Sequence, residues 1–257
     1  MASKQLIAIV RPVPDTITEC ELTHLHRSPI DVGTARRQHA RYEDALAAIG
    51  CHVHRLPPLH MHPDSVFVED TVLVLPEVAI ALRPGAESRR GEVESTIDFI
   101  QMHRPVHTIE SPGTLDGGDI LTIGRRVFIG LSSRSDTNAV HQLQDLLRPW
   151  NYTVHAVPVS DCLHLKSAVT VIDEEAVLCN PAWVDAQRFE ADTVIECDPN
   201  EPDGANVLRA SGQLVAGRFP RTNRKLRNAG YRVHELDLGE LAKAEGAVTC
   251  CSIIFEC

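Results

Sequence analysis

Residues 120–133, ILTIGRRVFIGLSS, consist of two short apolar runs joined by a polar turn at 124–126. Two such runs separated by a few turn-forming residues are typical of a β-hairpin. The same shape recurs at 72–85, 168–181 and 206–220. The sequence therefore predicts a series of similar hairpins, and the expected architecture follows from this repetition.

The stretches after the hairpins repeat as well. Polar residues and then a helix-like segment follow, as at 89–101, 135–147 and 221–230. Short strands come next, at 106–110, 152–159, 192–197 and 231–238. The unit is thus strand, strand, helix, strand, and its spacing of roughly 40–50 residues indicates a repeat architecture.

The two ends of the chain together predict a fifth unit. Residues 5–15 contain one apolar strand, which is followed by the helix-like stretch 31–50 and the strand 51–57. The missing partner strand is 252–257, and pairing these ends closes the ring and removes exposed sheet edges.

We therefore expect an α/β fold in which residues 1–257 form a single domain. Its architecture is a five-bladed ββαβ propeller with pseudo-fivefold symmetry, closed by the N- and C-terminal strands. An ordinary three-layer α/β sheet is disfavoured, because such sheets alternate single strands with helices rather than placing a hairpin before each helix.

Composition and charge narrow the class of protein. The chain has 257 residues and a net charge of −10, which argues against a nucleic-acid partner because phosphate contacts need an excess of Lys and Arg. No apolar stretch approaches the ~18 residues of a membrane span, so we expect no membrane association. The eight cysteines are scattered without a CxxC motif, as is typical of reduced thiols. These features predict a cytoplasmic protein.

Charged and reactive side chains gather in short clusters near the hairpins. These clusters are PDSVFVED (63–70), TLDGGD (114–119), CLHLKS (162–167) and VTCCS (248–252). Each alone has an ordinary explanation, since loop carboxylates cap turns, Asp-Gly-Gly forms a turn, and a buried Cys or His packs in a core. All lie at hairpin entrances or between units, however, so in a ring they can face one cavity.

The side chains of these clusters complement one another. A thiol nucleophile needs a partner that stabilises the thiolate, and His is the usual one. Grouped carboxylates repel each other unless a cation lies among them, and a planar guanidinium offers five donors in a fixed fork. The combination indicates nucleophilic attack on an electrophilic carbon inside a bound cation.

The motifs DSVFVED, RPGAESRRGE, LDGGD, LHLKS and TCCS occur in an order and spacing that resemble those of dimethylarginine dimethylaminohydrolases. These enzymes belong to the guanidine-modifying superfamily, which includes arginine deiminases. The resemblance extends over almost the whole chain and implies a five-bladed α/β-propeller. It also implies hydrolysis of N-omega-methylated arginines to L-citrulline and methylamine or dimethylamine, through a covalent thiouronium on cysteine and without a cofactor or a metal.

The resemblance assigns the catalytic roles. Cys250, the first of two adjacent cysteines, corresponds to the nucleophile, and Cys251 is then a packed neighbour. His164 corresponds to the catalytic histidine. Asp116 corresponds to the acidic residue that contacts the guanidinium and orients the histidine.

The same resemblance implies a set of substrate-binding residues. Glu69 and Asp70 would hold the guanidinium, and Phe67 would line the pocket. Asp64 and a backbone carbonyl near Leu22 would hold the α-ammonium, with Leu22 in a stretch that corresponds to a mobile lid. The α-carboxylate would be bound by two arginines, Arg89 and Arg134.

Other interpretations of the sequence stay open. An arginine deiminase or another amidinohydrolase of the same superfamily would share the Cys, His and carboxylates but prefer unmethylated arginine. A non-catalytic protein would bind a metal through CHVH (51–54) or LHMHP (59–63), or a ligand in a retained pocket. Rings of this size often dimerise through one face, so a homodimer is compatible with the sequence.

Overall fold

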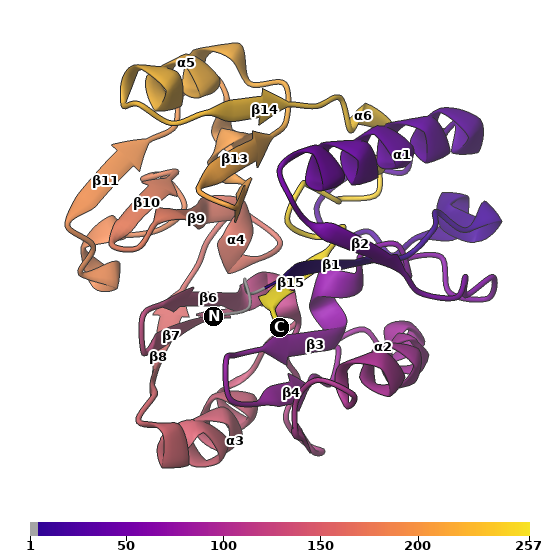
Figure 1. The fold of residues 1–257 in the computed structure, drawn as a ribbon, viewed down its shortest axis with the longest axis vertical. Coiled ribbons are helices and arrows are strands. Elements are labelled where there is room, and N and C mark those ends of the chain that lie inside the picture. The colour runs from indigo at the N-terminus through magenta and orange to yellow at the C-terminus, as the bar shows by residue number, and fades with distance from the viewer. Residues whose placement is uncertain (1–4) are drawn as a thin grey trace.

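The computed structural model describes residues 5–257. Its strands form five sheets of three strands each. Figure 1 shows these sheets around the middle of the molecule, with the longer helices toward the outside. Those helices are α1 (Val32–Ala48), α2 (Val93–Ile100), α3 (Thr137–Leu147) and α5 (Pro220–Asn228). The predicted ring of small α/β units is thus confirmed.

Four of the sheets share one construction, which the hairpin repeats predicted. The first two strands form an antiparallel hairpin, and the second strand pairs in parallel with the third. The strands are β3 (Val72–Val74), β4 (Ala79–Ala81) and β5 (Val106–Thr108); β6 (Ile120–Ile123), β7 (Arg126–Leu131) and β8 (Thr153–Pro158); β9 (Val169–Asp173), β10 (Ala176–Cys179) and β11 (Thr193–Glu196); and β12 (Val207–Ala210), β13 (Gln213–Ala216) and β14 (Val233–Glu235).

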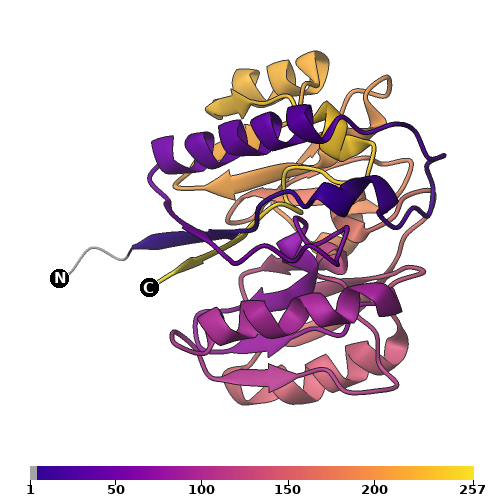
Figure 2. The same ribbon diagram turned by 90° about the vertical axis from the view of Figure 1, so that its right-hand side faces the viewer.

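The fifth sheet joins the two ends of the chain. Strand β15 (Ile253–Glu256) pairs antiparallel with β1 (Leu6–Val10), which pairs in parallel with β2 (His52–Arg55). Ile7 lies opposite Phe255 in this pairing. Figure 2 shows the two terminal strands side by side. The predicted closure of the ring by N- and C-terminal strands is therefore confirmed.

Helix α1 illustrates how an outer helix is specified. The carboxylate of its N-cap, Asp31, accepts a hydrogen bond from the backbone N–H of Thr34, which satisfies a donor that the first turn leaves unpaired. Ala35, Tyr42 and Leu46 follow at helical spacing and are completely buried against the fifth sheet and its neighbours. The apolar stripe thus fixes the helix against the ring.

The third unit departs from the expected strand, strand, helix, strand pattern. Between β10 and β11 the chain forms only the 3-10 helix η6 (Ala186–Phe189). This stretch begins with Pro181 and is interrupted by acidic residues, so it offers no long apolar stripe for a helix to bury. Phe189 is completely buried against Phe128, and Val184 is buried in the same core cluster.

Short helices stand mainly in the loops between these elements. They are η1 (Asp15–Glu19), η2 (Val68–Thr71), η3 (Glu87–Glu92), η4 (Gly117–Asp119), η5 (Arg148–Trp150), α4 (Leu165–Ala168), η7 (Pro202–Ala205) and α6 (Gly239–Ala242). Three of them, η2, η4 and α4, directly precede the first strand of a hairpin. Among residues 5–257, no helix combines the length and the apolar character needed to cross a membrane.

Candidate active site

Loops from several units converge on a small cavity. The cavity is narrow: the centre of a water-sized molecule can occupy about 20 Å³ of it. The lining residues are Glu21, Asp64, Phe67, Asp70, Arg89, Arg134, Leu163, His164, Ala244, Glu245 and Cys250. The structure therefore brings Cys250 and His164 to one hollow, together with several carboxylates.

Backbone contacts between the short helices hold these loops together. The N–H of Gly118 in η4 donates to the Asp70 carboxylate of η2 at 2.8 Å. The N–H of Leu165 in α4 donates to the Asp119 carboxylate at 2.9 Å. The N–H of Glu69 donates to the carbonyl oxygen of Cys250 at 3.2 Å. Four units thus meet through direct hydrogen bonds at the cavity.

The two glycines of LDGGD permit this close approach. A Cβ at Gly117 would lie 1.9 Å from the backbone oxygen of Glu69, and a Cβ at Gly118 would lie 2.8 Å from the ring of His164. Both distances are far inside van der Waals contact, so any side chain would separate η4 from its neighbours. The glycines are therefore required by packing rather than by a turn alone.

The imidazole of His164 is buried among carboxylates. Its Nδ1 lies 3.2 Å from Oδ2 of Asp119, and its Nε2 lies 3.9 Å from Oδ2 of Asp116. Burial by itself would lower the pKa of His164, but the negative charges of Asp119, Asp70 and Asp116 raise it to about 9. The histidine is therefore protonated at neutral pH in this environment.

Asp119 is a site residue to which the sequence interpretation gave no role. Its side chain is completely buried, and it accepts hydrogen bonds from the hydroxyls of Ser132 and Ser135 at 2.6 and 2.7 Å. It also accepts from Nδ1 of His164 and from the N–H of Leu165. The second Asp of the LDGGD motif was visible in the sequence, but nothing there showed that it, and not Asp116, would hold Nδ1.

Asp116 lies deeper in the same group. Its Oδ1 accepts a hydrogen bond from the N–H of Gly85 at 2.8 Å, whereas its buried Oδ2 has no partner among the described residues. Burial raises the pKa of Asp116 to about 6, and the charge of Asp70 acts in the same direction. A buried carboxylate oxygen without a hydrogen-bond partner therefore lies beside His164.

The two adjacent thiols have different surroundings. Cys250 lines the cavity, and burial together with the charges of Glu69 and Asp70 raises its pKa to about 12. Cys251 is completely buried, and its Sγ donates to the carbonyl oxygen of Ala247 at 3.5 Å. Only the first thiol thus faces a site where it could react, and there it is neutral until a positive charge approaches.

Asp70 and Arg89 form a buried ion pair beside the cavity. Nη1 of Arg89 lies 2.6 Å from Oδ2 of Asp70, and Nη2 donates to Glu92 and to the carbonyl oxygen of Phe67 at 2.9 and 3.0 Å. Burial alone would raise the pKa of Asp70, but the Arg89 charge lowers it to about 2. Asp70 is therefore a permanent negative charge, and most donors of Arg89 are used within the protein.

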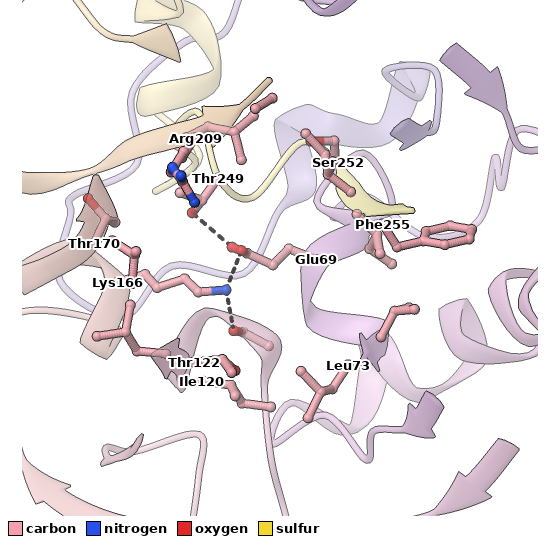
Figure 3. A pocket seen from close by; sticks show the side chains of 18 of the residues that line it. Glu69, Leu73, Ile120, Thr122, Lys166, Thr170, Arg209, Thr249, Ser252 and Phe255 are labelled. Atoms are coloured by element: carbon pink, nitrogen blue, oxygen red, sulfur yellow. Dashed lines mark hydrogen bonds and ion pairs between the residues drawn. The ribbon is translucent and has the colours of Figure 1, made fainter. Parts of the chain in front are cut away.

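Glu69 points to a different cavity. Its carboxylate accepts from Nζ of Lys166 at 2.6 Å and from the hydroxyl of Thr249 at 2.8 Å (Figure 3). These residues line a second cavity, of about 730 Å³. One edge strand of each sheet also lines it, namely β3, β6, β9, β12 and β15. The Glu69 carboxylate thus does not line the small cavity with His164 and Cys250, although its charge acts on the Cys250 thiol.

Asp64 and Arg134, which are expected at the amino-acid end of a substrate, also line the small cavity. Oδ2 of Asp64 accepts from the N–H of Glu21 at 3.0 Å, and burial raises the pKa of Asp64 to about 6. Nη2 of Arg134 donates to the hydroxyl of Thr23 at 3.0 Å. Leu22, between these two contacts in sequence, is half-buried against the largest core cluster.

Among residues 5–257, one group of side chains has the spacing of metal ligands. Ligand atoms of Asp70, Asp116 and His164 lie within 4.8 Å of one another. Such a group suits a planar organic cation as well as an ion, because carboxylates accept hydrogen bonds from a guanidinium in the same way. The histidines of 51–54 and 59–63 belong to no such group; His54 instead stacks on Phe99 with a ring-centroid distance of 3.8 Å.

The sequence is similar to those of known enzymes. The arginine deiminase family model matches residues 99–206. The N(G),N(G)-dimethylarginine dimethylaminohydrolase of Streptomyces coelicolor is 38% identical over 256 residues, which cover 98% of this chain and 97% of that protein.

Solved structures give the same result. The dimethylarginine dimethylaminohydrolase of Pseudomonas aeruginosa, solved as a Cys-to-Ser variant with citrulline, superposes with a TM-score of 0.92 at 32% identity and covers 98% of this chain and 100% of that one. An adduct of a dimethylarginine dimethylaminohydrolase His-to-Gly variant with S-methyl-L-thiocitrulline also has a TM-score of 0.92, at 34% identity over 96% and 98% of the two chains. The chain belongs to the dimethylarginine dimethylaminohydrolase family.

Proposed function

We propose that this protein hydrolyses N-omega-methylated arginines, asymmetric dimethylarginine and monomethylarginine, to L-citrulline and the corresponding methylamine. The observation that carries the proposal is the shared position of a thiol, an imidazole and several carboxylates around one small cavity. The relatives that cover nearly the whole chain carry this activity in their names, and one of their structures holds citrulline.

The guanidinium of the substrate would bind on the acidic side of the cavity. Asp70 supplies a permanent negative charge, and Asp116 supplies an unpaired oxygen. Phe67 lines the same cavity and offers an apolar face to the substrate's alkyl chain. Glu69 is bonded to Lys166 and Thr249 instead, so we assign it the support of the loop and not direct contact through its carboxylate.

The amino-acid end of the substrate would bind on the opposite side. Asp64 would pair with the α-ammonium, assisted by the carbonyl of Leu22, and that positive charge would lower the raised pKa of Asp64. Arg134 would bind the α-carboxylate after releasing the hydroxyl of Thr23. Arg89 would add the Nη1–H that its bonds within residues 5–257 leave unused.

Catalysis would proceed in two halves. The cationic guanidinium stabilises the Cys250 thiolate, whose proton leaves to solvent, and the sulfur then bonds to the guanidinium carbon. His164, protonated because its pKa is about 9, donates its proton to the departing methylamine or dimethylamine as the C–N bond breaks. A thiouronium on Cys250 remains.

The second half consumes one water molecule. The now neutral His164 accepts one proton from water as the oxygen bonds to the same carbon. The C–S bond then breaks, the remaining hydroxyl proton passes to the departing sulfur, and L-citrulline and the Cys250 thiol are released. Asp119 would hold Nδ1 of His164 throughout, so that Nε2 exchanges protons with the reacting groups. The two half-reactions together consume the substrate and one water molecule and need no other reactant.

A citrulline assay with three substrates tests the proposal. We expect kcat/KM for asymmetric dimethylarginine and monomethylarginine to exceed that for arginine, because specificity is a difference in transition-state binding. A preference for arginine would instead identify an arginine deiminase. No citrulline from any of the three would contradict the proposed hydrolysis.

A further inference from the structure

The segment 21–25, called here the lid segment, borders the small cavity. Glu21 lines the cavity, and the next residues are largely exposed. The segment has no regular secondary structure of its own. Its position therefore depends on what its backbone and side chains contact.

One carboxylate binds three consecutive backbone donors of the lid segment. Oε1 of Glu245 accepts from the N–H groups of His24 and Leu25 at 2.6 Å each. Both carboxylate oxygens accept from the N–H of Thr23, at 3.1 and 3.0 Å. Successive N–H groups that point to one spot form an anion-binding concavity, and bonds to an ionised acceptor are the stronger kind.

Glu245 reaches this position through an unfavourable backbone conformation. Its φ is 58°, in the left-handed region that a non-glycine residue rarely adopts. The following Gly246 lets the loop pack against Phe67, because a Cβ there would lie 2.1 Å from the Phe67 ring. Such strain persists only where the surroundings hold it, and here the held loop continues directly to Cys250.

The other contacts of the lid segment are made by side chains that would bind the substrate. Arg134 donates to the Thr23 hydroxyl, and Asp64 accepts from the Glu21 N–H. In the proposed function these two side chains bind the α-carboxylate and the α-ammonium. Glu245 has no such competing task, so its three bonds can persist when the other contacts exchange for substrate.

We infer that Glu245 is a positioning residue. Its hydrogen bonds, called here the latch, join the lid segment to the loop 245–250 that ends at Cys250. They thereby hold the Leu22 carbonyl where it can contact the substrate. Through this latch Glu245 acts on substrate binding and not on the chemical step. The kinetic consequence rests on the proposed function, whereas the latch itself is a property of the free protein and can be measured without turnover.

Hydrogen exchange in the free full-length protein tests the latch. In Glu245→Ala the amides of 23–25 lose their acceptor, and we expect them to exchange about tenfold faster. Alanine keeps the Cβ, so the left-handed strain at this position is unchanged and only the carboxylate is removed.

The matched control is Glu190→Ala. Glu190 is also a non-glycine residue with positive φ, 47°, but it is exposed and its carboxylate lies 3.6 Å from Arg126, outside the cavity. We expect this control to leave exchange at 23–25 unchanged. Equal exchange in Glu245→Ala and the wild type would overturn the inference, and so would faster exchange spread over the whole chain, since that would report general destabilisation.

Steady-state kinetics with asymmetric dimethylarginine test the consequence. We expect KM of Glu245→Ala to rise about tenfold while kcat changes less than about threefold, because uniform binding is lost. Glu245→Gln retains one acceptor oxygen, so its KM should lie between those of the wild type and Glu245→Ala. A fall in kcat at unchanged KM would contradict a positioning role. If the wild type forms no citrulline, the proposed function fails while the exchange result still decides the latch.

Discussion

Of the two adjacent thiols, only Cys250 lines the cavity, whereas Cys251 is sealed in the core. We expect Cys250→Ser to lose citrulline formation by at least about a thousandfold, because a hydroxyl is a far weaker nucleophile than a thiolate. Cys251→Ser is the matched change one residue away and should retain most activity. An activity assay on both folded variants decides, and an inactive Cys251→Ser with active Cys250→Ser would mean that the nucleophile is the other thiol.

The bond between Asp119 and Nδ1 of His164 should show in the pH dependence of kcat. His164 must be protonated to release the amine, so activity falls as pH rises through its pKa of about 9. Asp119→Asn removes the largest favourable charge, which lowers that pKa and moves the alkaline fall in activity to lower pH.

The control for this experiment is Ser132→Ala. It removes one hydrogen bond to Asp119 but leaves the carboxylate charge beside His164. A much smaller displacement of the pH profile is expected for it. A profile that is unchanged in Asp119→Asn, with activity merely reduced, would assign Asp119 a structural role only.

At the scale of elements, the contact between η2 and η4 depends on the absence of side chains. Gly117→Ala would place a Cβ 1.9 Å from the backbone oxygen of Glu69. We expect the free energy of unfolding to fall by about 2 kcal/mol or more, as in other overpacked sites, and activity to fall with it because η4 carries Asp119.

Gly33→Ala serves as a milder change, because an added Cβ there would meet side-chain atoms rather than backbone. Its nearest neighbour would be the Asp31 carboxylate at 3.3 Å, in the first turn of α1. Thermal or denaturant unfolding should show little change for this variant, since alanine also favours the helix. Equal stability of the two alanine variants would contradict the packing argument at Gly117.

The elements also show why the hairpins could be predicted better than the helices. A hairpin is a local structure whose apolar runs and turn stand next to each other in sequence, as at 120–133. The connection between β10 and β11 was expected to contain a helix, but it forms only η6, from which Phe189 packs into the core. Whether a connection becomes a helix depends on the room between neighbouring units, and that room is set by tertiary packing.

At the scale of the whole molecule, the terminal sheet links the first and last residues of the described chain. Phe255 in β15 is 6% exposed and packs with the core cluster that includes Ile7 and Ile100. We propose that the chain is a single domain, and we expect Phe255→Ala to lower the free energy of unfolding by about 3 kcal/mol in one cooperative transition.

The control is Met61→Ala, because Met61 is 85% exposed and should contribute little. Unfolding followed by two probes, one spectroscopic and one by activity, distinguishes the outcomes. Two separate transitions for Phe255→Ala would contradict a single domain, and an unchanged midpoint would contradict the importance of ring closure.

The repeat, the pairing of the two chain ends and the motif residues could all be inferred from the amino-acid sequence, because strand alternation and turn chemistry are local. The roles of neighbouring carboxylates could not be inferred in this way and became visible in the fold: Asp119 rather than Asp116 holds Nδ1 of His164, and Glu69 pairs with Lys166 while Asp70 faces the cavity. The physical reason is that adjacent residues in a short helix point in different directions, and the partner of each comes from another unit of the ring.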